Sequence, residues 1–514
     1  MASWTSGYVA DIGYTFGFYR ELTPSLLSFV ALVRGQQGPD AAGPLTYCEL
    51  GCGQGFSMNL LAAANPHARF YATDFNPSQI AGARQLAAEA GLSNVFFSDT
   101  SFADFASQPD LPDQFDVISL HGIYSWISEE NRKAIVDFIA RKLKVGGLVY
   151  VSYNCLPGWS AAAPMRQLMY MHTRTGGGPT APRLESALAF VEKVMQSEAA
   201  FFKVNPGMKE RFERVKGQNR NYLAHEYLND DWNLLYHSDV AGEMSAAKLS
   251  FLGSAALLDQ VDAINLTTEQ QQLMVETTDP LMRETLRDFM INQQFRRDVF
   301  VKGAVPLSAR RAQETWLDQR FALSVLASDI EMKVKGARGE ATLQEDVYSP
   351  VLKAFADGPK SVRELFNSDK TIADLGWARI QQALAILVGA GHLHPSLPAR
   401  NEGARIKSTK AFNLAVCQRA RDSADLQFLA SPVTGGGVQL ARFPQLFLLA
   451  LAEGKKQSDD WAEFAWKVIS DQGQRILKEG KALETPEENV AELKVQATTF
   501  GEKQLPLLRQ LQVV

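Results

Sequence analysis

The sequence lacks the patterns that would place it in a membrane or build a structural metal site. No apolar run approaches the ~18 residues needed to span a bilayer, and no basic stretch followed by an apolar one stands at the start of the chain. Its four cysteines (Cys48, Cys52, Cys155 and Cys417) form no C-x-x-C pair. We therefore expect a reduced, cytoplasmic protein with no membrane insertion and no metal.

Two common phosphate-binding loops are also missing. The turn Glu49-Leu50-Gly51-Cys52-Gly53-Gln54-Gly55 has neither the G-K-S/T ending of a P-loop nor the G-x-G-x-x-G of a dinucleotide site. Its acidic residue makes a phosphate an unsuitable guest, whereas glycines at alternate positions let the backbone approach a ligand closely. The pattern indicates either a turn that binds another kind of ligand or a tight strand-to-helix turn with none.

Basic residues are scarce in the first part of the chain. Residues 1–160 hold nine Lys and Arg against fourteen Asp and Glu, while the rest of the 514 residues hold 43 of each. Nucleic-acid binders generally present a basic face, so we expect no nucleic-acid partner. An acidic region instead tolerates or attracts a basic substrate. The chain is long enough for two to four domains.

Between residues 45 and 153, short apolar segments alternate with helical ones, which predicts a parallel α/β sheet. Strands are expected at 45–50, 69–73, 95–97, 115–120 and 148–153, and helices at 78–90 and 129–143. Ligands bind beyond the carboxyl ends of such strands. Polar and acidic residues cluster at those ends, which favours a binding site there.

The pattern E-x-G-x-G-x-G resembles motif I of the class I S-adenosylmethionine (AdoMet)-dependent methyltransferases. The resemblance implies a Rossmann-like domain with a seven-stranded, mainly parallel sheet. It also implies that the glycine turn holds the methionine moiety of a cationic cofactor, AdoMet, which leaves as S-adenosylhomocysteine.

Two further strand ends fit this cofactor. Asp74 ends the second strand 19 residues after Gly55, where a carboxylate can bind both ribose hydroxyls. The residues after the third strand could hold the adenine through a carboxylate and an apolar ring. The predicted cofactor site comprises Tyr14, Glu49, Gly51, Gly53, Gly55, Asp74, Phe75, Asp99, Thr100, Ser101, Phe102 and His121.

The ends of the fourth and fifth strands should face the methyl group. They supply the predicted catalytic residues His121, Tyr124, Trp126, Tyr153 and Asn154, although a single buried Tyr or Trp is more often part of the core. Adenine- and glutamine-directed methyltransferases often carry N-P-P-Y or D-P-P-Y after strand four. This chain has His-Gly-Ile-Tyr, which weakens a nucleobase interpretation.

Longer segments resemble the bacterial methyltransferases that carry an appended methyltransferase regulatory domain, among them the rickettsial outer-membrane-protein lysine methyltransferases. They include DIGYTFGFYRELTP, LHGIYSWIS, SYNCLPGW and YLAHEYLNDDWNLLYHSDVA. The resemblance implies a protein substrate, with an envelope protein before export as one option. A homodimer is left open. The aromatic leader, residues 8–34, is either core packing or a lid over the cofactor.

We predict four regions: a catalytic domain with its leader at 1–160, a helical regulatory or dimerisation domain at 161–330, a winged-helix-like module at 345–400 and a helical domain at 401–514. The helix of the module that would read DNA has one basic residue, so a protein contact is favoured over DNA. His225, Glu226, His237 and Asp239 lack H-E-x-x-H spacing, so a polar packing patch or a channel wall is favoured over a metal site.

Three functions remain open. The favoured one is protein lysine N-methylation, in which aromatic walls and neutral acceptors lower the pKa of the lysine amine. Tyr124, Trp126, Tyr153 and Asn154 would form that pocket, and His121 would orient the amine or accept its proton. A small metabolite or saccharide as acceptor would need a closed pocket walled by residues 200–300. A regulator that binds AdoMet without transfer would have an incomplete site.

Overall fold

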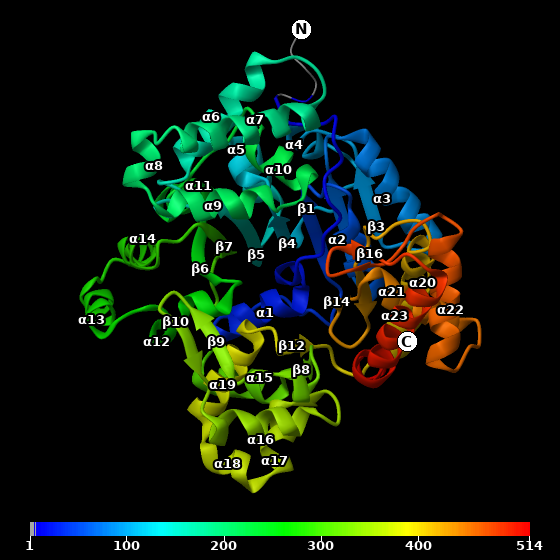
Figure 1. Cartoon of the computed structure of the whole chain (residues 1–514). Coiled ribbons are helices and arrows are strands. Elements are labelled where there is room, and N and C mark those ends of the chain that lie inside the picture. Colours follow the sequence, from blue (N-terminus) through cyan, green and yellow to red (C-terminus); the bar gives the residue numbers. More distant parts are fainter. Residues whose placement is uncertain (1–4, 6) are drawn as a thin grey trace.

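A seven-stranded sheet lies at the centre of the molecule (Figure 1). The computed structural model describes Thr5 and residues 7–514. The strand order is β3-β2-β1-β4-β5-β7-β6, and β7 is antiparallel to both of its neighbours. The strands are β1 Thr46–Leu50, β2 Arg69–Thr73, β3 Val95–Ser98, β4 Phe115–Leu120, β5 Leu143–Asn154, β6 Leu249–Ser254 and β7 Phe295–Lys302.

The predicted fold class is confirmed, and the first four strands lie within one residue of their predicted places, whereas β5 begins at Leu143, five residues before the predicted start. The sheet also runs across the boundary expected at residue 160, because β6 and β7 belong to the region read as helical. The charged residues Arg296, Arg297 and Asp298 interrupt the apolar pattern of β7. The domain boundaries themselves stay predictions.

Helices flank the sheet and connect its parallel strands. Asn76 caps α3 through its side chain, and Ser128 caps α5 in the same way. Phe29 of α1 packs edge-on against Trp316 and Phe321, so α1 joins the sheet to the lower part of the molecule in Figure 1. These helices are α1 Pro24–Val33, α2 Phe56–Ala64, α3 Pro77–Glu89, α4 Phe102–Phe105 and α5 Glu129–Lys142.

The segment between β5 and β7 adds mostly helices. They are α6 Ala163–Thr175, α7 Thr180–Gln196, α8 Ala200–Val204, α9 Gly207–Lys216, α10 Arg220–Tyr227, α11 His237–Ser245, α12 Asp262–Asn265, α13 Thr268–Glu276 and α14 Pro280–Ile291. Five of them, α6–α10, gather at the upper end of the molecule in Figure 1.

The winged-helix-like region forms a small unit at the opposite end (Figure 1). Strand β8, which precedes this region in the sequence, completes its three-stranded sheet in the order β11-β8-β12. Its elements are α15 Ala309–Asp318, β8 Arg320–Leu323, β9 Lys333–Gly336, β10 Gly339–Thr342, α16 Glu345–Phe355, β11 Lys360–Ser361, α17 Val362–Ser368, α18 Lys370–Leu375, α19 Trp377–Gly389 and β12 Leu393–Ser396.

The C-terminal region packs on α2 and α3 beside the central sheet. Arg419 pairs with Glu89 at 2.8 Å, and Asn65 donates to the carbonyl of Gly435 at 2.7 Å. Its elements are α20 Glu402–Arg419, β13 Phe428–Ser431, β14 Gly436–Gln439, α21 Arg442–Ala452, α22 Ser458–Ser470, β15 Leu477–Lys478, β16 Lys481–Ala482, α23 Pro486–Thr499 and α24 Leu505–Gln510.

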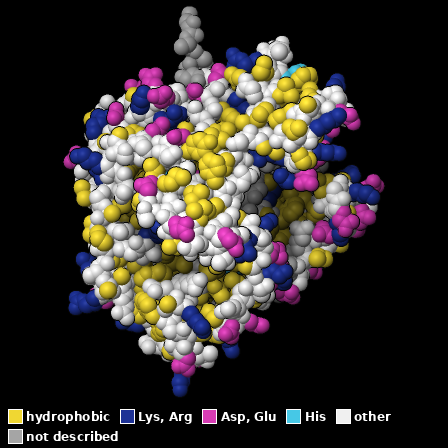
Figure 2. Space-filling model, turned by 90° about the vertical axis from the view of Figure 1, so that its left-hand side faces the viewer, with side chains coloured by type: hydrophobic (Ala, Val, Ile, Leu, Met, Phe, Trp, Pro, Cys, Tyr) yellow, Lys and Arg dark blue, Asp and Glu magenta, His cyan; other side chains and the backbone are white. Residues whose placement is uncertain are grey.

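Hydrophobic side chains gather on the face that bears α13 and α14 (Figure 2). The exposed ones on these two helices are Leu273, Val275, Leu281, Met282 and Phe289. The homodimer stays a prediction, and this face would be available to it. Among the described residues, no helix is long and apolar enough to cross a membrane.

Candidate active site

A cavity of about 210 Å³ lies at the carboxyl ends of β1, β2 and β4. Ten of the twelve predicted cofactor residues line it, from the leader, the glycine turn and the strand ends. They are Tyr14, Glu49, Gly51, Gly53, Asp74, Phe75, Thr100, Ser101, Phe102 and His121. The structure therefore brings together residues that are up to 107 positions apart in the sequence.

The glycine turn requires glycine for two reasons. Gly51 and Gly55 adopt φ angles of +77° and +64°, a region that side chains disfavour. A Cβ on Gly55 would also lie 2.5 Å from the Cβ of Ala83 and 2.7 Å from the ring of Phe97. Gly55 does not line the cavity but lets α2 begin directly beneath it.

Two buried carboxylates face each other across this turn. Asp74 is held by backbone donors, because its Oδ2 accepts from the amide of Gly53 at 2.9 Å and its Oδ1 from that of Asn76 at 3.0 Å. Burial, and then the charge of Asp74, raise the pKa of Glu49 to about 8. The buried Oε2 of Glu49 has no hydrogen-bond partner among the described residues. A cationic ligand would supply the missing countercharge, so the site fits AdoMet.

Asp99 does not reach the cavity. Its carboxylate lies 3.4 Å from Arg84, and both side chains are about half exposed. The neighbouring residues Thr100, Ser101 and Phe102 line the cavity instead. The prediction that the Asp99 carboxylate holds the adenine is not supported by this placement.

The aromatic leader forms one wall of the cavity. The amide of Val9 donates to Asn229 Oδ1 at 2.8 Å, and His225 Nε2 lies 3.0 Å from the carbonyl of Ile12. The ring of Tyr14 packs edge-on against His225, with 5.0 Å between centroids. Residues of α10 and the turn after it thus hold the leader beside the cofactor cavity, and the lid role of the leader stays a prediction.

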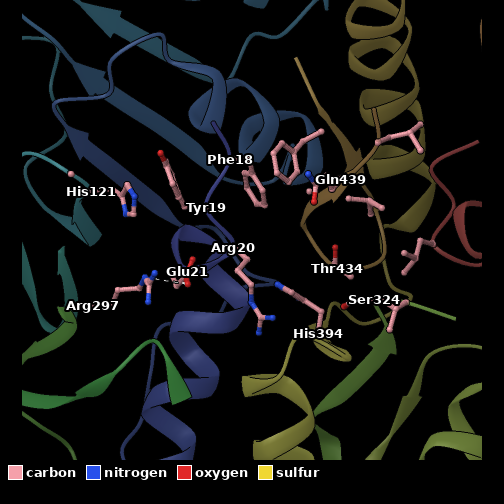
Figure 3. Close-up of a pocket in the computed structure, with 18 of the residues that line it drawn as sticks. Phe18, Tyr19, Arg20, Glu21, His121, Arg297, Ser324, His394, Thr434 and Gln439 are labelled. Atoms are coloured by element: carbon pink, nitrogen blue, oxygen red, sulfur yellow. Dashed lines mark ion pairs between the residues drawn. The ribbon is translucent and has the colours of Figure 1, made fainter. Parts of the chain in front are cut away.

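A second cavity, of about 1000 Å³, adjoins the first (Figure 3). Its walls come from the leader, residues 121–126, β5, α10, β7, residues 324–329, residues 391–394, the β13–β14 hairpin and residues 499–511. The two cavities share five residues, namely Tyr14, Tyr19, His121, Gly122 and Trp126. We call these five residues the junction.

His121 is a neutral group at the junction. Its ring stacks on Tyr19 with 3.6 Å between centroids, and its Nδ1 lies 2.9 Å from the hydroxyl of Tyr150. Burial, with a smaller contribution from Arg297, lowers the pKa of His121 to about 3. So weak a base suits the predicted orienting role better than proton acceptance.

Asn154 and Glu226 stand together in the second cavity. Asn154 Nδ2 donates to Glu226 Oε1 at 3.1 Å, and the Asn154 amide donates to Ser125 Oγ at 2.8 Å. Burial raises the pKa of Glu226 to about 7, against the lowering effect of the hydrogen bond from Asn154. Sequence reasoning treated Glu226 as a patch or channel residue and gave it no catalytic role. Its only signal was an acidic residue within a run of aromatic and apolar ones.

Two predicted catalytic residues line neither cavity. The buried Tyr153 donates its hydroxyl to Asp298 at 2.6 Å, and the buried Tyr124 donates to Glu243. Successive side chains of a strand point to opposite faces, so Tyr153 enters the core when Asn154 faces the cavity. Trp126 lines both cavities and Asn154 the second, and their catalytic roles stay predictions.

The polar residues considered for a metal lie apart. His225 contacts the leader, while His237 pairs with Asp298 at 3.0 Å. Within residues 7–514 and Thr5, no group of three or more His, Cys, Asp or Glu side chains could hold a metal ion.

Comparisons with known proteins agree with this architecture. The family described as a methyltransferase domain matches residues 43–233, and the predicted methyltransferase regulatory domain matches residues 219–302. An uncharacterised protein of Synechocystis is 47% identical over 509 residues, which cover 99% of both chains. An uncharacterised protein of Rickettsia prowazekii is 27% identical over 319 residues, or 57% of this chain and 56% of that protein.

A solved structure has the same fold over nearly the whole chain. It is PKMT2 from Rickettsia typhi in complex with AdoHcy, which is 18% identical with a TM-score of 0.69 and covers 95% of this chain and 98% of that one. The chain belongs to the family of class I AdoMet-dependent methyltransferases that carry an appended methyltransferase regulatory domain.

Proposed function

We propose that this methyltransferase modifies lysine side chains of a protein substrate. The observation that carries the proposal is a buried carboxylate, Glu226, in a long cavity that meets the cofactor cavity at the junction. The known lysine methyltransferases that the sequence resembles, and the fold shared with rickettsial PKMT2, support the same activity.

The second cavity is lined by three cationic and three acidic side chains, and one of the acidic ones, Glu226, has no ion pair within the part of the chain that the structure describes. Glu21 is paired with Arg297 at 3.5 Å (Figure 3), and Asp329 with Lys503 at 3.7 Å. Glu226 has no such ion pair among the described residues and bonds instead to the neutral amide of Asn154. Burial raises the pKa of Glu226, the nearby guanidinium groups of Arg211 and Arg166 partly offset that rise, and a lysine ammonium that enters the cavity would add a further countercharge.

Glu226 also suits removal of the lysine proton. An amine with an ordinary pKa of about 10.4 is protonated near neutral pH and cannot attack. Burial lowers the pKa of the amine, and a carboxylate with a pKa of about 7 can take its proton. The proton then passes from Glu226 to water through the cavity.

The junction orients the neutral amine. Methyl transfer from a sulfonium is an in-line displacement, so catalysis consists largely of positioning. When bound, the cofactor supplies an activated methyl group and keeps the electron pair of the broken S–C bond. Tyr14, Tyr19 and Trp126 offer aromatic faces that hold cationic groups, and His121 and the Asn154 oxygen can accept hydrogen bonds from the amine.

Two other functions have less support. A small-molecule acceptor calls for a pocket closed by residues 200–300, but this cavity continues along residues 324–511. A regulator without transfer calls for an incomplete site, whereas Glu49, Asp74, Glu226, His121 and Trp126 all line the two adjoining cavities.

Labelled AdoMet tests the proposal. The enzyme is incubated with a cell-envelope protein fraction and, in parallel, with a small-molecule extract. We expect label on protein lysines in the first sample. Label confined to the small-molecule extract would reject the proposal while leaving the methyltransferase assignment intact.

A further inference from the structure

Strand β14 runs along the second cavity. Gly437, Val438, Gln439 and Leu440 all line it, as does Phe18 of the leader. A Cβ on Gly437 would lie 2.7 Å from the Phe18 ring, and the next residue, Tyr19, stacks on His121. Two consecutive residues therefore join this strand to the junction.

The pairing of β14 with β13 leaves one side of its backbone free. The amide of Leu440 donates to the carbonyl of Gln427 at 2.8 Å, and Val438 stands opposite Leu429. Hydrogen-bonded pairs alternate along an antiparallel ladder, so Val438 and Gly436 bond to β13. The amides and carbonyls of Gly437 and Gln439 must then point away from β13.

The two edges of this hairpin differ. On the β13 side, Asn413 of α20 caps Ala430, accepting from its amide at 2.7 Å and donating to its carbonyl at 3.0 Å. On the β14 side, the outward groups of Gly437 and Gln439 have no hydrogen-bond partner among the described residues. An unpaired edge is a template for another strand, and this one faces the cavity.

We propose that the β14 edge binds an extended segment of the substrate protein by strand addition. This inference rests on the proposed lysine methylation, because it places the chain that carries the lysine. The four outward groups of Gly437 and Gln439 would bond to the main chain of the segment. Alternate side chains of the segment would meet Phe18 and Phe428, whose rings lie 5.6 Å apart. Figure 3 shows Gln439 and Phe18 facing the same cavity as His121.

Recognition through main-chain groups depends on extended backbone more than on sequence. The enzyme should therefore accept a 13-residue synthetic peptide in which Thr and Val alternate around one central Lys. We expect Gln439→Pro to raise KM for this peptide tenfold or more. Proline has no backbone N–H, so residue 439 could no longer donate a hydrogen bond to the peptide. Gln439→Ala keeps that amide and should raise KM about twofold, with kcat similar in both variants.

The peptide itself provides a second, independent test with wild-type enzyme. Single N-methyl groups are placed on successive peptide amides, and KM is measured for each. Strand addition predicts that KM rises at every second position on one side of the lysine. Thermal unfolding and AdoMet affinity show whether Gln439→Pro is folded, and the N-methyl series decides the matter if it is not.

Three results would overturn the inference. They are equal KM values for Gln439→Pro and Gln439→Ala, an N-methyl series without alternation, and no methylation of the peptide by an enzyme that labels protein lysines. The last result leaves the proposed function standing, whereas absence of label on any protein lysine removes both. A dimer in solution that Gln439→Pro dissociates would assign the edge to a second copy of the chain.

Discussion

The two cavities that meet at the junction are built in different ways. The cofactor cavity draws mainly on one glycine turn and three strand ends within residues 49–127, with the leader as a wall. The second cavity takes its walls from nine segments spread from residue 14 to residue 511. Cofactor binding should therefore depend on few residues, whereas acceptor binding should depend on how the regions pack together.

The largest expected effect belongs to the cofactor side. Asp74→Ala removes a carboxylate that holds the turn through the Gly53 amide, so we expect AdoMet affinity to fall at least 100-fold by calorimetry. Asp99→Ala is the matched control, because it breaks only an exposed pair with Arg84 and should change affinity less than threefold. Micromolar binding by Asp74→Ala would contradict the cofactor assignment.

On the acceptor side, the strongest effect should come from Glu226→Gln. The kcat for lysine methylation should fall about 100-fold, within the range typical of general bases, with AdoMet affinity unchanged. For the wild-type enzyme, kcat/KM should rise with pH through about 7, as Glu226 loses its proton. A variant that keeps this limb of the pH profile would exclude Glu226 as the base.

Glu49 provides a stability test of the cofactor side. Burial raises its pKa from 4.5 to about 8, so between these values the folded state binds more protons than the unfolded state. Stability of the protein without AdoMet should therefore fall as pH rises through this window. Glu49→Gln removes that loss and should raise the free energy of unfolding at pH 8 by a few kcal/mol, on the order of 1.4 per pKa unit.

The control for Glu49→Gln is the same comparison at pH 4, where Glu49 is protonated in both states and little change is expected. The variant should also bind AdoMet more weakly, because it no longer supplies a charge to the cation. An equal gain in unfolding free energy at both pH values would mean that ionisation of Glu49 is not the cause.

A smaller effect on activity is expected for Tyr153, which was predicted from the sequence to be catalytic. Tyr153→Phe removes the hydroxyl that donates to the buried Asp298, so it should cost about 1–3 kcal/mol of stability in urea unfolding. The kcat should change less than threefold, since Tyr153 lines neither cavity. A 100-fold loss of kcat in a stably folded variant would restore the catalytic interpretation.

The contrast between the cavities also explains which residues could be predicted from the sequence and which could not. Gly51 belongs to a glycine turn and Asp74 ends a strand, so the spacing of residues along the sequence was enough to predict that both lie at the cofactor cavity. Tyr153 shows the limit of that reasoning, because adjacent residues of a strand point to opposite faces and Asn154 rather than Tyr153 lines the cavity. Asp99 lies 3.4 Å from Arg84 with its side chain about half exposed, and its contact with the adenine stays a prediction.

Glu226 could not be assigned from the sequence, because its role depends on contacts between distant segments. It reaches Asn154 across 72 positions only after α10 packs on the end of β5. The same holds for β7, whose buried Arg296 and Asp298 form an ion pair at 2.9 Å. A strand with paired charged residues lacks the apolar pattern by which strands are predicted from sequence.

The most direct test of the central claim is the site of methylation itself. Cell lysate is treated with wild-type enzyme or Glu226→Gln and with AdoMet that carries a deuterium-labelled methyl group, and the digested proteins are analysed by mass spectrometry. We predict labelled methyl groups on lysine Nζ atoms with the wild-type enzyme and about 100-fold less with Glu226→Gln. Label on other side chains only, or equal lysine labelling by both enzymes, would contradict the account.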